Sequence, residues 1–158
     1  MSTRFIGLMS GTSMDGVDGV LVDVHEGNLT VLSHQSAPLD SQLRRELLSL
    51  NESGLDELHR GAIAANALVR VYAQVVQALL HHSGVPAQEV RAIGAHGQTV
   101  RHRPGQFDGV GYTLQLNQPA LLAELCHIDV VADFRSRDVA AGGQGAPLVP
   151  LFHQQCFG

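Results

Sequence analysis

The sequence contains no lysine, and all ten of its basic residues are arginines. A Walker A phosphate loop needs a lysine, and so does the Schiff-base chemistry of pyridoxal phosphate enzymes. Both kinds of site are therefore excluded for this 158-residue chain acting alone.

Positive charge, cysteine and long apolar segments are also scarce. Ten basic residues against fifteen acidic ones give a net charge of −5, which argues against binding to a nucleic-acid backbone. The two cysteines, Cys126 and Cys156, form no CxxC pair, which suits a reducing compartment. No unbroken apolar run reaches the roughly 18 residues of a membrane-spanning helix, and the N-terminus does not look like a signal peptide. We expect a cytoplasmic protein that binds neither nucleic acid nor membrane.

The first half of the chain changes from strand patterns to helix patterns. Its length and its 44% of apolar residues fit one domain that buries about two-thirds of its unfolded surface. Alternating and β-branched segments predict three strands joined by tight turns, over residues 4–8, 17–24 and 29–34. Asp40 or Ser41 is then expected to cap a short helix. A longer helix should end at Gly84, with an apolar stripe made of Leu58, Ala62, Ala65, Val69, Tyr72, Val76 and Leu79.

The second half alternates between strands and helices. Strands are predicted over residues 90–95, 112–116 and 128–134, with a loop over residues 101–111. Pro119 is well placed to begin a helix. A second helix is predicted to begin near Leu148, after a glycine-rich loop over residues 140–147. The fold class that follows is α/β, with a mixed sheet and flanking helices.

The first turn (residues 11–18) combines glycines, hydroxyls and carboxylates between two predicted strands. Glycines let backbone N–H groups approach an anion, and Thr12 and Ser13 add hydroxyl donors. Asp15 or Asp18 can hold a divalent cation through water, because Mg²⁺ prefers oxygen ligands beside phosphates. The predicted phosphate-binding residues are Gly11, Thr12, Ser13, Met14, Asp15, Gly16, Val17 and Asp18.

Two other interpretations of the first turn stay open. A hairpin turn can be rich in Gly, Asp and Ser for conformational reasons alone. The spacing of Gly11 and Ser13 also matches part of the nucleophile elbow of serine hydrolases, although the second glycine stands at Gly16, one residue late. That elbow needs a helix after the serine, whereas residues 17–24 indicate a strand.

Two further polar clusters follow predicted strands. His96 and Gln98 lie at the carboxyl end of a strand, where open α/β sheets bind ligands. Asp133 ends the last predicted strand and Arg135 follows it, and an arginine fork suits a carboxylate or a phosphate. The alternatives are a buried histidine bonded to a nearby loop, and an internal Arg–Asp network that braces the glycine-rich loop. The histidines form no HxxxH or HExxH pattern, so zinc is not expected.

Several segments are distinctive enough to compare with known families. They are residues 7–18 (GLMSGTSMDGVD), residues 96–102 (HGQTVRH), and a long stretch from residues 118–124 (QPALLAE) through 128–135 (IDVVADFR) to 142–150 (GGQGAPLVP). In this order, and over the whole length of the chain, they resemble the anhydro-N-acetylmuramic acid kinase family.

The resemblance implies a sugar kinase with the actin/hexokinase/Hsp70-like (ribonuclease H-like) ATPase fold, in which the first hairpin turn wraps the phosphates of ATP. The family opens the 1,6-anhydro bond of its sugar with water and phosphorylates O6 from ATP, giving N-acetylmuramate 6-phosphate for cell-wall recycling. ATP and Mg²⁺ are thus the expected cofactors, with Asp15 and Asp18 near the metal. The expected sugar contacts, at strand ends facing the cleft between two lobes, are His96, Gln98, Asn117, Asp133 and Arg135.

Members of this family are over twice as long and have two lobes. Their catalytic aspartate lies in a later Asp-x-Gly-Pro-Gly-Asn motif, which this sequence lacks. The resemblance therefore implies that residues 1–158 are the N-terminal lobe, without the catalytic residue and inactive alone. The alternative is a non-catalytic ATPase-fold module that binds a sugar or a partner. An exposed, apolar cleft face would also favour a homodimer.

Overall fold

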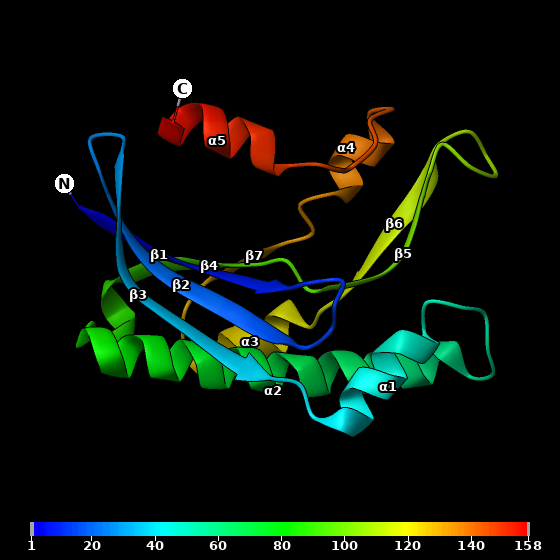
Figure 1. The fold of residues 1–158 in the computed structure, drawn as a ribbon, viewed down its shortest axis with the longest axis horizontal. Helices are drawn as coiled ribbons and strands as arrows, with labels where there is room; N and C mark the ends of the chain where they lie inside the picture. Colours follow the sequence, from blue (N-terminus) through cyan, green and yellow to red (C-terminus); the bar gives the residue numbers. More distant parts are fainter. Residues whose placement is uncertain (1, 158) are drawn as a thin grey trace.

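A five-stranded mixed sheet forms the centre of the molecule (Figure 1). The computed structural model describes the backbone of residues 2–157 and their side chains, except those of residues 151 and 155–157, so the Cys156 side chain lies outside the described part. The strand order is β3-β2-β1-β4-β7. The strands are β1 (Thr3–Ser10), β2 (Gly16–His25), β3 (Asn28–Pro38), β4 (Val90–Ala95) and β7 (Val130–Ala132). The predicted α/β class with a mixed sheet is confirmed.

The direction of the strands decides which loops meet. β1, β2 and β3 form an antiparallel meander, whereas β4 runs parallel to β1 and β7 runs parallel to β4. Parallel strands end on the same side of a sheet. The chain therefore leaves β1, β4 and β7 at one edge, which we call the carboxyl edge, and enters there the first turn, His96 and Asp133 respectively.

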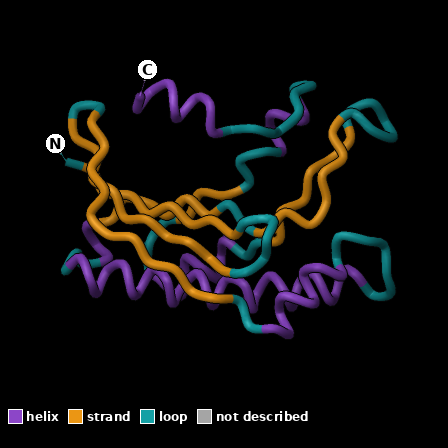
Figure 2. The backbone as a smooth tube through the Cα atoms, viewed as in Figure 1, coloured by secondary structure: helices purple, strands orange, loops and turns teal. Residues whose placement is uncertain are grey.

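Three helices cover one face of the sheet, as Figures 1 and 2 show. The side chain of Asp40 caps the first by accepting hydrogen bonds from the amides of Gln42 and Leu43, and the second ends at Gly84 in the left-handed conformation. Both helix boundaries agree with the sequence prediction. The helices are α1 (Ser41–Ser49), α2 (Glu57–Ser83) and α3 (Pro119–Cys126).

The buried face of α2 turns along its length. Val69, Tyr72 and Val76 are buried as predicted. Leu58 is 93% exposed and Ala62 is exposed too, so the prediction that these two residues belong to the buried stripe is wrong. The first turns of α2 lie beside α1 and β6 instead of the sheet, and the neighbours there bury a face that includes Gly61 and Ala64. The apolar stripe follows the packing partners, which change along the helix.

Although the chain has no long unbroken apolar run, α2 contains a window with a mean hydropathy of 1.4, which by length and composition could cross a membrane. Half of that window is buried inside the molecule. The helix lies directly on β2: a Cβ atom placed on Gly19 would stand 2.4 Å from Cγ1 of Val75. These contacts identify α2 as the central core helix of the fold.

A hairpin replaces part of the loop that was predicted over residues 101–111. β5 (Gln98–Pro104) and β6 (Gly111–Leu116) pair in an antiparallel two-stranded sheet that rises from the carboxyl edge. Arg101 on β5 forms an ion pair with Glu57 of α2, so the strand is held against the helix. This polar segment, which ends at Pro104, forms a strand because β6 and α2 provide it with partners. Strand propensity does not report such contacts between distant segments.

The other face of the sheet is less completely covered. α4 (Ser136–Ala140) and α5 (Val149–Phe157) pass over it, and a short 3₁₀ turn, η1 (Ala87–Glu89), lies before β4. An apolar cavity of about 680 Å³ lies between α5 and the sheet, with Phe134 and Phe152 in its wall. β7 is shorter than predicted because Asp133 adopts the left-handed conformation (φ 59°), which ends the strand after Ala132.

Candidate functional site

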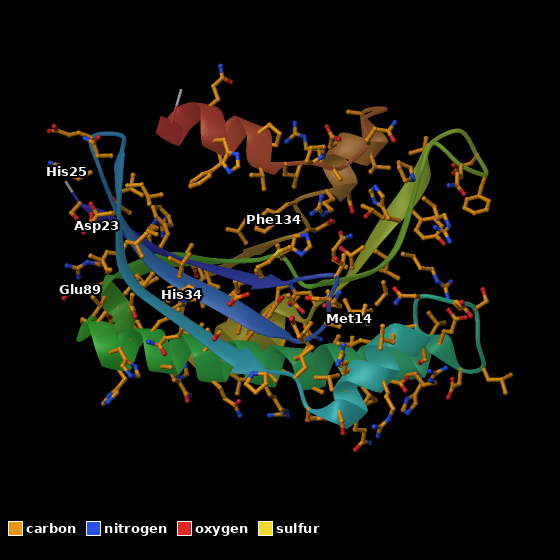
Figure 3. All side chains as sticks on the ribbon, in the orientation of Figure 1. Met14, Asp23, His25, His34, Glu89 and Phe134 are labelled. Atoms are coloured by element: carbon orange, nitrogen blue, oxygen red, sulfur yellow. The ribbon has the colours of Figure 1, made fainter. Side chains whose placement is uncertain are left out.

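Two buried side chains fix the shape of the first turn. The amide of Met14 donates to the carbonyl of Gly11 over 3.1 Å, and Met14 takes the left-handed conformation (φ 52°). Its side chain is 2% exposed and lies between the turn and α1 (Figure 3). Val17 is fully buried as well. Met14 and Val17 were both predicted to bind phosphate, but here their side chains pack in the core and hold the turn, so only their backbones can face a ligand.

The outer side of the turn carries free polar groups. Thr12, Ser13 and Asp15 are exposed, and the backbone N–H groups of Gly11, Thr12 and Ser13 have no hydrogen-bond partner among the described residues. Such unpaired amides in a tight turn are donors for an anion. The turn therefore presents N–H groups, hydroxyls and a carboxylate on one surface.

Asp15 is held in its charged form. The hydroxyl of Ser13 donates to its Oδ1 over 2.8 Å, and this hydrogen bond is the largest influence that lowers the pKa of the Asp15 carboxyl. Backbone amides and the charge of Arg44 act in the same direction. Arg44 also reaches the carbonyl of Ser13 over 3.5 Å, so it links α1 to the turn. Asp15 is accordingly an anion at neutral pH.

The two predicted metal-binding carboxylates face one cavity. Asp15 and Asp18 line a shallow cavity of about 370 Å³ together with residues 36–38 of β3. The Oδ1 atom of Asp18 also lies 3.6 Å from Nε2 of His34. In the described part of the chain no group of three or more His, Cys, Asp or Glu side chains could enclose a metal ion. Two carboxylates suit a hydrated Mg²⁺ that takes its remaining ligands from water and phosphate oxygens.

The hydrogen bonds of His96 define its tautomer. Nδ1 lies 2.8 Å from the carbonyl of Gly97, to which it must donate, and Nε2 accepts from Nε of Arg135 over 2.9 Å. Burial lowers the pKa of His96, and the charge of Arg135 lowers it further against the opposing bond to Gly97. The imidazole is therefore neutral and protonated at Nδ1.

Arg135 donates hydrogen bonds to two other segments and has a further N–H group without a partner among the described residues. Its Nη1 donates to the carbonyl of Gly145, and the amide of Gly145 donates to Oδ2 of Asp138 over 2.7 Å. The glycine-rich loop wraps Asp138 so closely that a Cβ atom on Gly143 would stand 2.3 Å from its carboxylate. Nη2 of Arg135 has no partner among the described side chains and backbone groups. Arg135 thus takes part in the internal network and still has a donor without a partner among the described residues.

The other three predicted sugar contacts are Asn117, Asp133 and Gln98, and of these only Gln98 is fully buried. Asn117 donates to the carbonyl of Ala95 over 3.0 Å, beside His96, and the carboxylate of Asp133 accepts from Ser136. Gln98 is fully buried and accepts a hydrogen bond from the hydroxyl of Ser10. In this arrangement Gln98 joins β5 to β1 and has no surface for a ligand. His96, Asn117, Asp133 and Arg135 do gather at the carboxyl edge.

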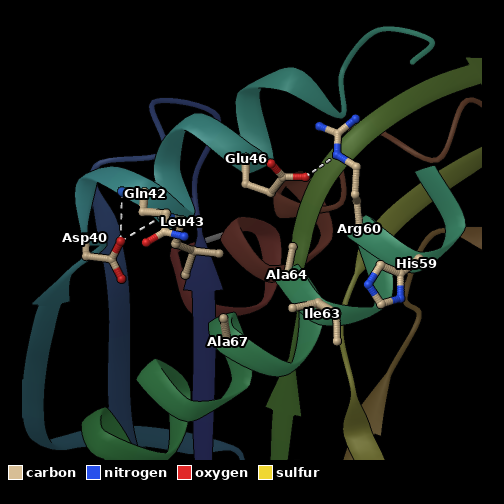
Figure 4. A pocket seen from close by; sticks show the side chains of 9 residues that line it. All are labelled: Asp40, Gln42, Leu43, Glu46, His59, Arg60, Ile63, Ala64 and Ala67. Atoms are coloured by element: carbon tan, nitrogen blue, oxygen red, sulfur yellow. Dashed lines mark hydrogen bonds and ion pairs between the residues drawn. The ribbon is translucent and has the colours of Figure 1, made fainter. Parts of the chain in front are cut away.

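Sequence reasoning missed three residues around this edge. Tyr72 was expected only as a member of the apolar stripe of the long helix, and neither Ser10 nor Arg44 was assigned a role at the site. The one available signal was Ser10, a polar residue directly before the glycines of the first turn. A separate cavity of about 420 Å³ between α1 and α2, crossed by the Glu46–Arg60 ion pair, contains none of the predicted site residues (Figure 4).

The neutral state of His96 predicts a pH dependence of stability. Its pKa is lower in the folded chain than the usual 6.5, so below that pH the unfolded chain binds more protons and folding weakens. We expect Tm to fall between about pH 7.5 and about pH 5.5, and to fall less in His96→Gln, which cannot titrate. Equal decreases in the two proteins, measured by differential scanning calorimetry, would contradict this assignment.

Comparisons with known proteins identify the family. The sequence model of the anhydro-N-acetylmuramic acid kinase family matches residues 3–158. Proteins of that name from Albidiferax ferrireducens, Variovorax paradoxus and Bordetella petrii are 68%, 65% and 67% identical to this chain, over 100%, 97% and 97% of its length. The chain spans only 41%, 41% and 40% of those relatives.

One solved structure also aligns with the chain. It is the Aquifex aeolicus member of the Ppx/GppA family, and the alignment covers 85% of this chain and 36% of that one. The TM-score is 0.38 at 9% identity, a likeness so distant that no functional conclusion follows from it. The family match stands on sequence, over nearly the whole chain: this chain belongs to the anhydro-N-acetylmuramic acid kinase family.

Proposed function

We propose that this chain supplies the nucleotide-binding turn and part of the sugar site of an ATP-dependent anhydro-N-acetylmuramic acid kinase. The observation that carries the proposal is the first turn: free backbone amides, two exposed hydroxyls and two carboxylates at the carboxyl edge, in a member of this kinase family. The reaction adds water across the 1,6-anhydro bond and transfers the γ-phosphoryl group of ATP to O6. The products are N-acetylmuramate 6-phosphate and ADP.

The first turn suits the triphosphate of ATP without a lysine. The amides of Gly11, Thr12 and Ser13 can donate to phosphate oxygens, and the hydroxyl of Thr12 can add one more donor, whereas that of Ser13 already donates to Asp15. Mg²⁺ neutralises charge on the phosphates when it is bound, and Asp15 and Asp18 are the residues that would hold its water ligands. The turn thereby positions the nucleotide, which is the main contribution a protein makes to phosphoryl transfer.

The sugar side of the proposal rests on the polar groups at the ends of β4 and β7. Nη2 of Arg135 is free to meet a carboxylate, and a muramic sugar carries one on its lactyl group. Neutral His96 fixes the guanidinium by accepting from its Nε. Asn117 and Asp133 lie at the same edge, where they can bind sugar hydroxyls. These residues orient the sugar toward the nucleotide.

The relatives are longer than this chain. The chain spans about 41% of the Albidiferax ferrireducens relative, and we propose that it forms the N-terminal lobe, with the residue that activates water on the other lobe. On this proposal the chain alone does not turn over substrate. The reaction belongs to cell-wall recycling, and we place it in the cytoplasm.

A fusion protein tests the nucleotide role directly. In it, the part of the Albidiferax ferrireducens relative beyond the matched region follows Gly158 of this chain. We expect the fusion to phosphorylate the anhydro sugar, and Asp15→Asn to lower kcat/KM for Mg-ATP by about 10- to 100-fold because the metal loses a charged partner.

The matched control is Asp129→Asn, an exposed carboxylate at the opposite edge of the sheet, which should leave the kinetics unchanged. Equal kinetics in Asp15→Asn and the unmodified fusion, assayed over a range of Mg²⁺ concentrations, would remove Asp15 from the nucleotide site. An unmodified fusion that folds but binds no Mg-ATP would refute the proposed function.

Arg135 provides the test of the sugar side. In the same fusion, Arg135→Ala should raise the KM for the anhydro sugar by about 10- to 100-fold, the loss of one hydrogen bond between charged groups, and change the KM for ATP far less. Arg137→Ala, an exposed arginine two residues further on, is the control and should change neither. An unaltered sugar KM in steady-state assays of Arg135→Ala would rule out the carboxylate contact.

A further inference from the structure

Helix α2 carries an unpaired hydroxyl into the core beneath the carboxyl edge. Tyr72 is 0% exposed, and its hydroxyl is the one buried side-chain polar atom in the described part of the chain that has no hydrogen-bond partner. Burying a polar group without a partner destabilises a fold, and a phenylalanine would fill the same space. Packing alone therefore does not explain why this residue is a tyrosine.

The hydroxyl lies against the two segments that the proposed function assigns to ligands. The backbone amides of Ser10 and Gly97 face its oxygen, but neither forms a hydrogen bond of good geometry in this structure. Burial outweighs these amides and raises the pKa of Tyr72 well above its usual range. The phenol therefore stays protonated.

Those two positions are the ends of the ligand-facing segments. Ser10 is the last residue of β1 before the first turn, and Gly97 directly follows His96. The backbone of Gly97 packs closely against the residue that ends β6, because a Cβ atom there would stand 2.5 Å from the carbonyl oxygen of Leu116. A small displacement of either segment would therefore change the geometry around the hydroxyl.

Two hydrogen bonds already couple these segments across the sheet. The hydroxyl of Ser10 donates to Oε1 of Gln98, and both side chains are buried. The amide of His96 donates to the carbonyl of Leu8 over 3.1 Å. The end of β1 and the residues around His96 are thus joined by direct contacts.

We propose that Tyr72 is a positioning residue whose hydroxyl gains a hydrogen bond at Ser10 or Gly97 when the first turn closes on the phosphates of a nucleotide. The proposal rests on the proposed function of that turn. The free state carries an unpaired hydroxyl and the bound state pairs it, so the difference between the two states favours nucleotide binding. Through the Ser10–Gln98 contact, the same closure fixes the sugar side.

The substitution Tyr72→Phe separates this role from simple packing. In the fusion protein we expect it to raise the KM for Mg-ATP by about 3- to 10-fold, the equivalent of one neutral hydrogen bond. In the ligand-free fusion protein we expect Tyr72→Phe to leave Tm unchanged or to raise it by about 2–4 °C, because the substitution removes an unpaired buried group. Tyr112→Phe, which alters an exposed tyrosine on β6, is the control and should leave the KM for Mg-ATP unchanged.

Two results for Tyr72→Phe would overturn the proposal. A lower Tm of the ligand-free protein would show that the hydroxyl is already paired without nucleotide. A higher Tm with an unchanged KM for Mg-ATP in an active fusion would show that the hydroxyl is only a packing defect, and the proposed function would survive. An unmodified fusion that binds no nucleotide overturns the proposed function, and this proposal with it.

Discussion

β1, β4 and β7 run in the same direction in one hydrogen-bonded sheet, and this alignment determines where chemistry can occur. Residues that are more than a hundred positions apart, such as Ser13 and Asp133, leave the sheet at one edge because their strands end there. The apolar face of α2 keeps the sheet in place, since α2 lies directly against β2. The proposed nucleotide and sugar contacts all depend on that parallel alignment.

The groups at this edge are supported by polar contacts that are buried or part-buried. Ser10 and Gln98 join β1 to β5, Asn117 joins the segment after β6 to β4, and Arg135 joins His96 to the glycine-rich loop. Buried hydrogen bonds of this kind are directional, so they fix the spacing between segments that apolar packing alone would leave adjustable. The first turn and the polar groups at the carboxyl edge are thereby held in one frame.

Much of the fold could be predicted because its signals are local. The capping residue Asp40, the terminating Gly84 and the buried strand over residues 90–95 act on their own neighbourhoods, and all three predictions are confirmed. The rest depends on partners far away in the sequence. β5 forms where a loop was expected because β6 and α2 hold it, and Gln98 is buried because Ser10 reaches it. Periodicity reports burial, but it does not report which polar atoms meet.

The central claim is that the first turn cradles nucleotide phosphates. A crystal structure of the fusion protein with Mg²⁺ and a non-hydrolysable ATP analogue tests this most directly. We expect phosphate oxygens within hydrogen-bonding distance of the amides of Gly11, Thr12 and Ser13, with the metal ion on the side of Asp15 and Asp18. A triphosphate bound elsewhere, for instance between α1 and α2, would contradict it.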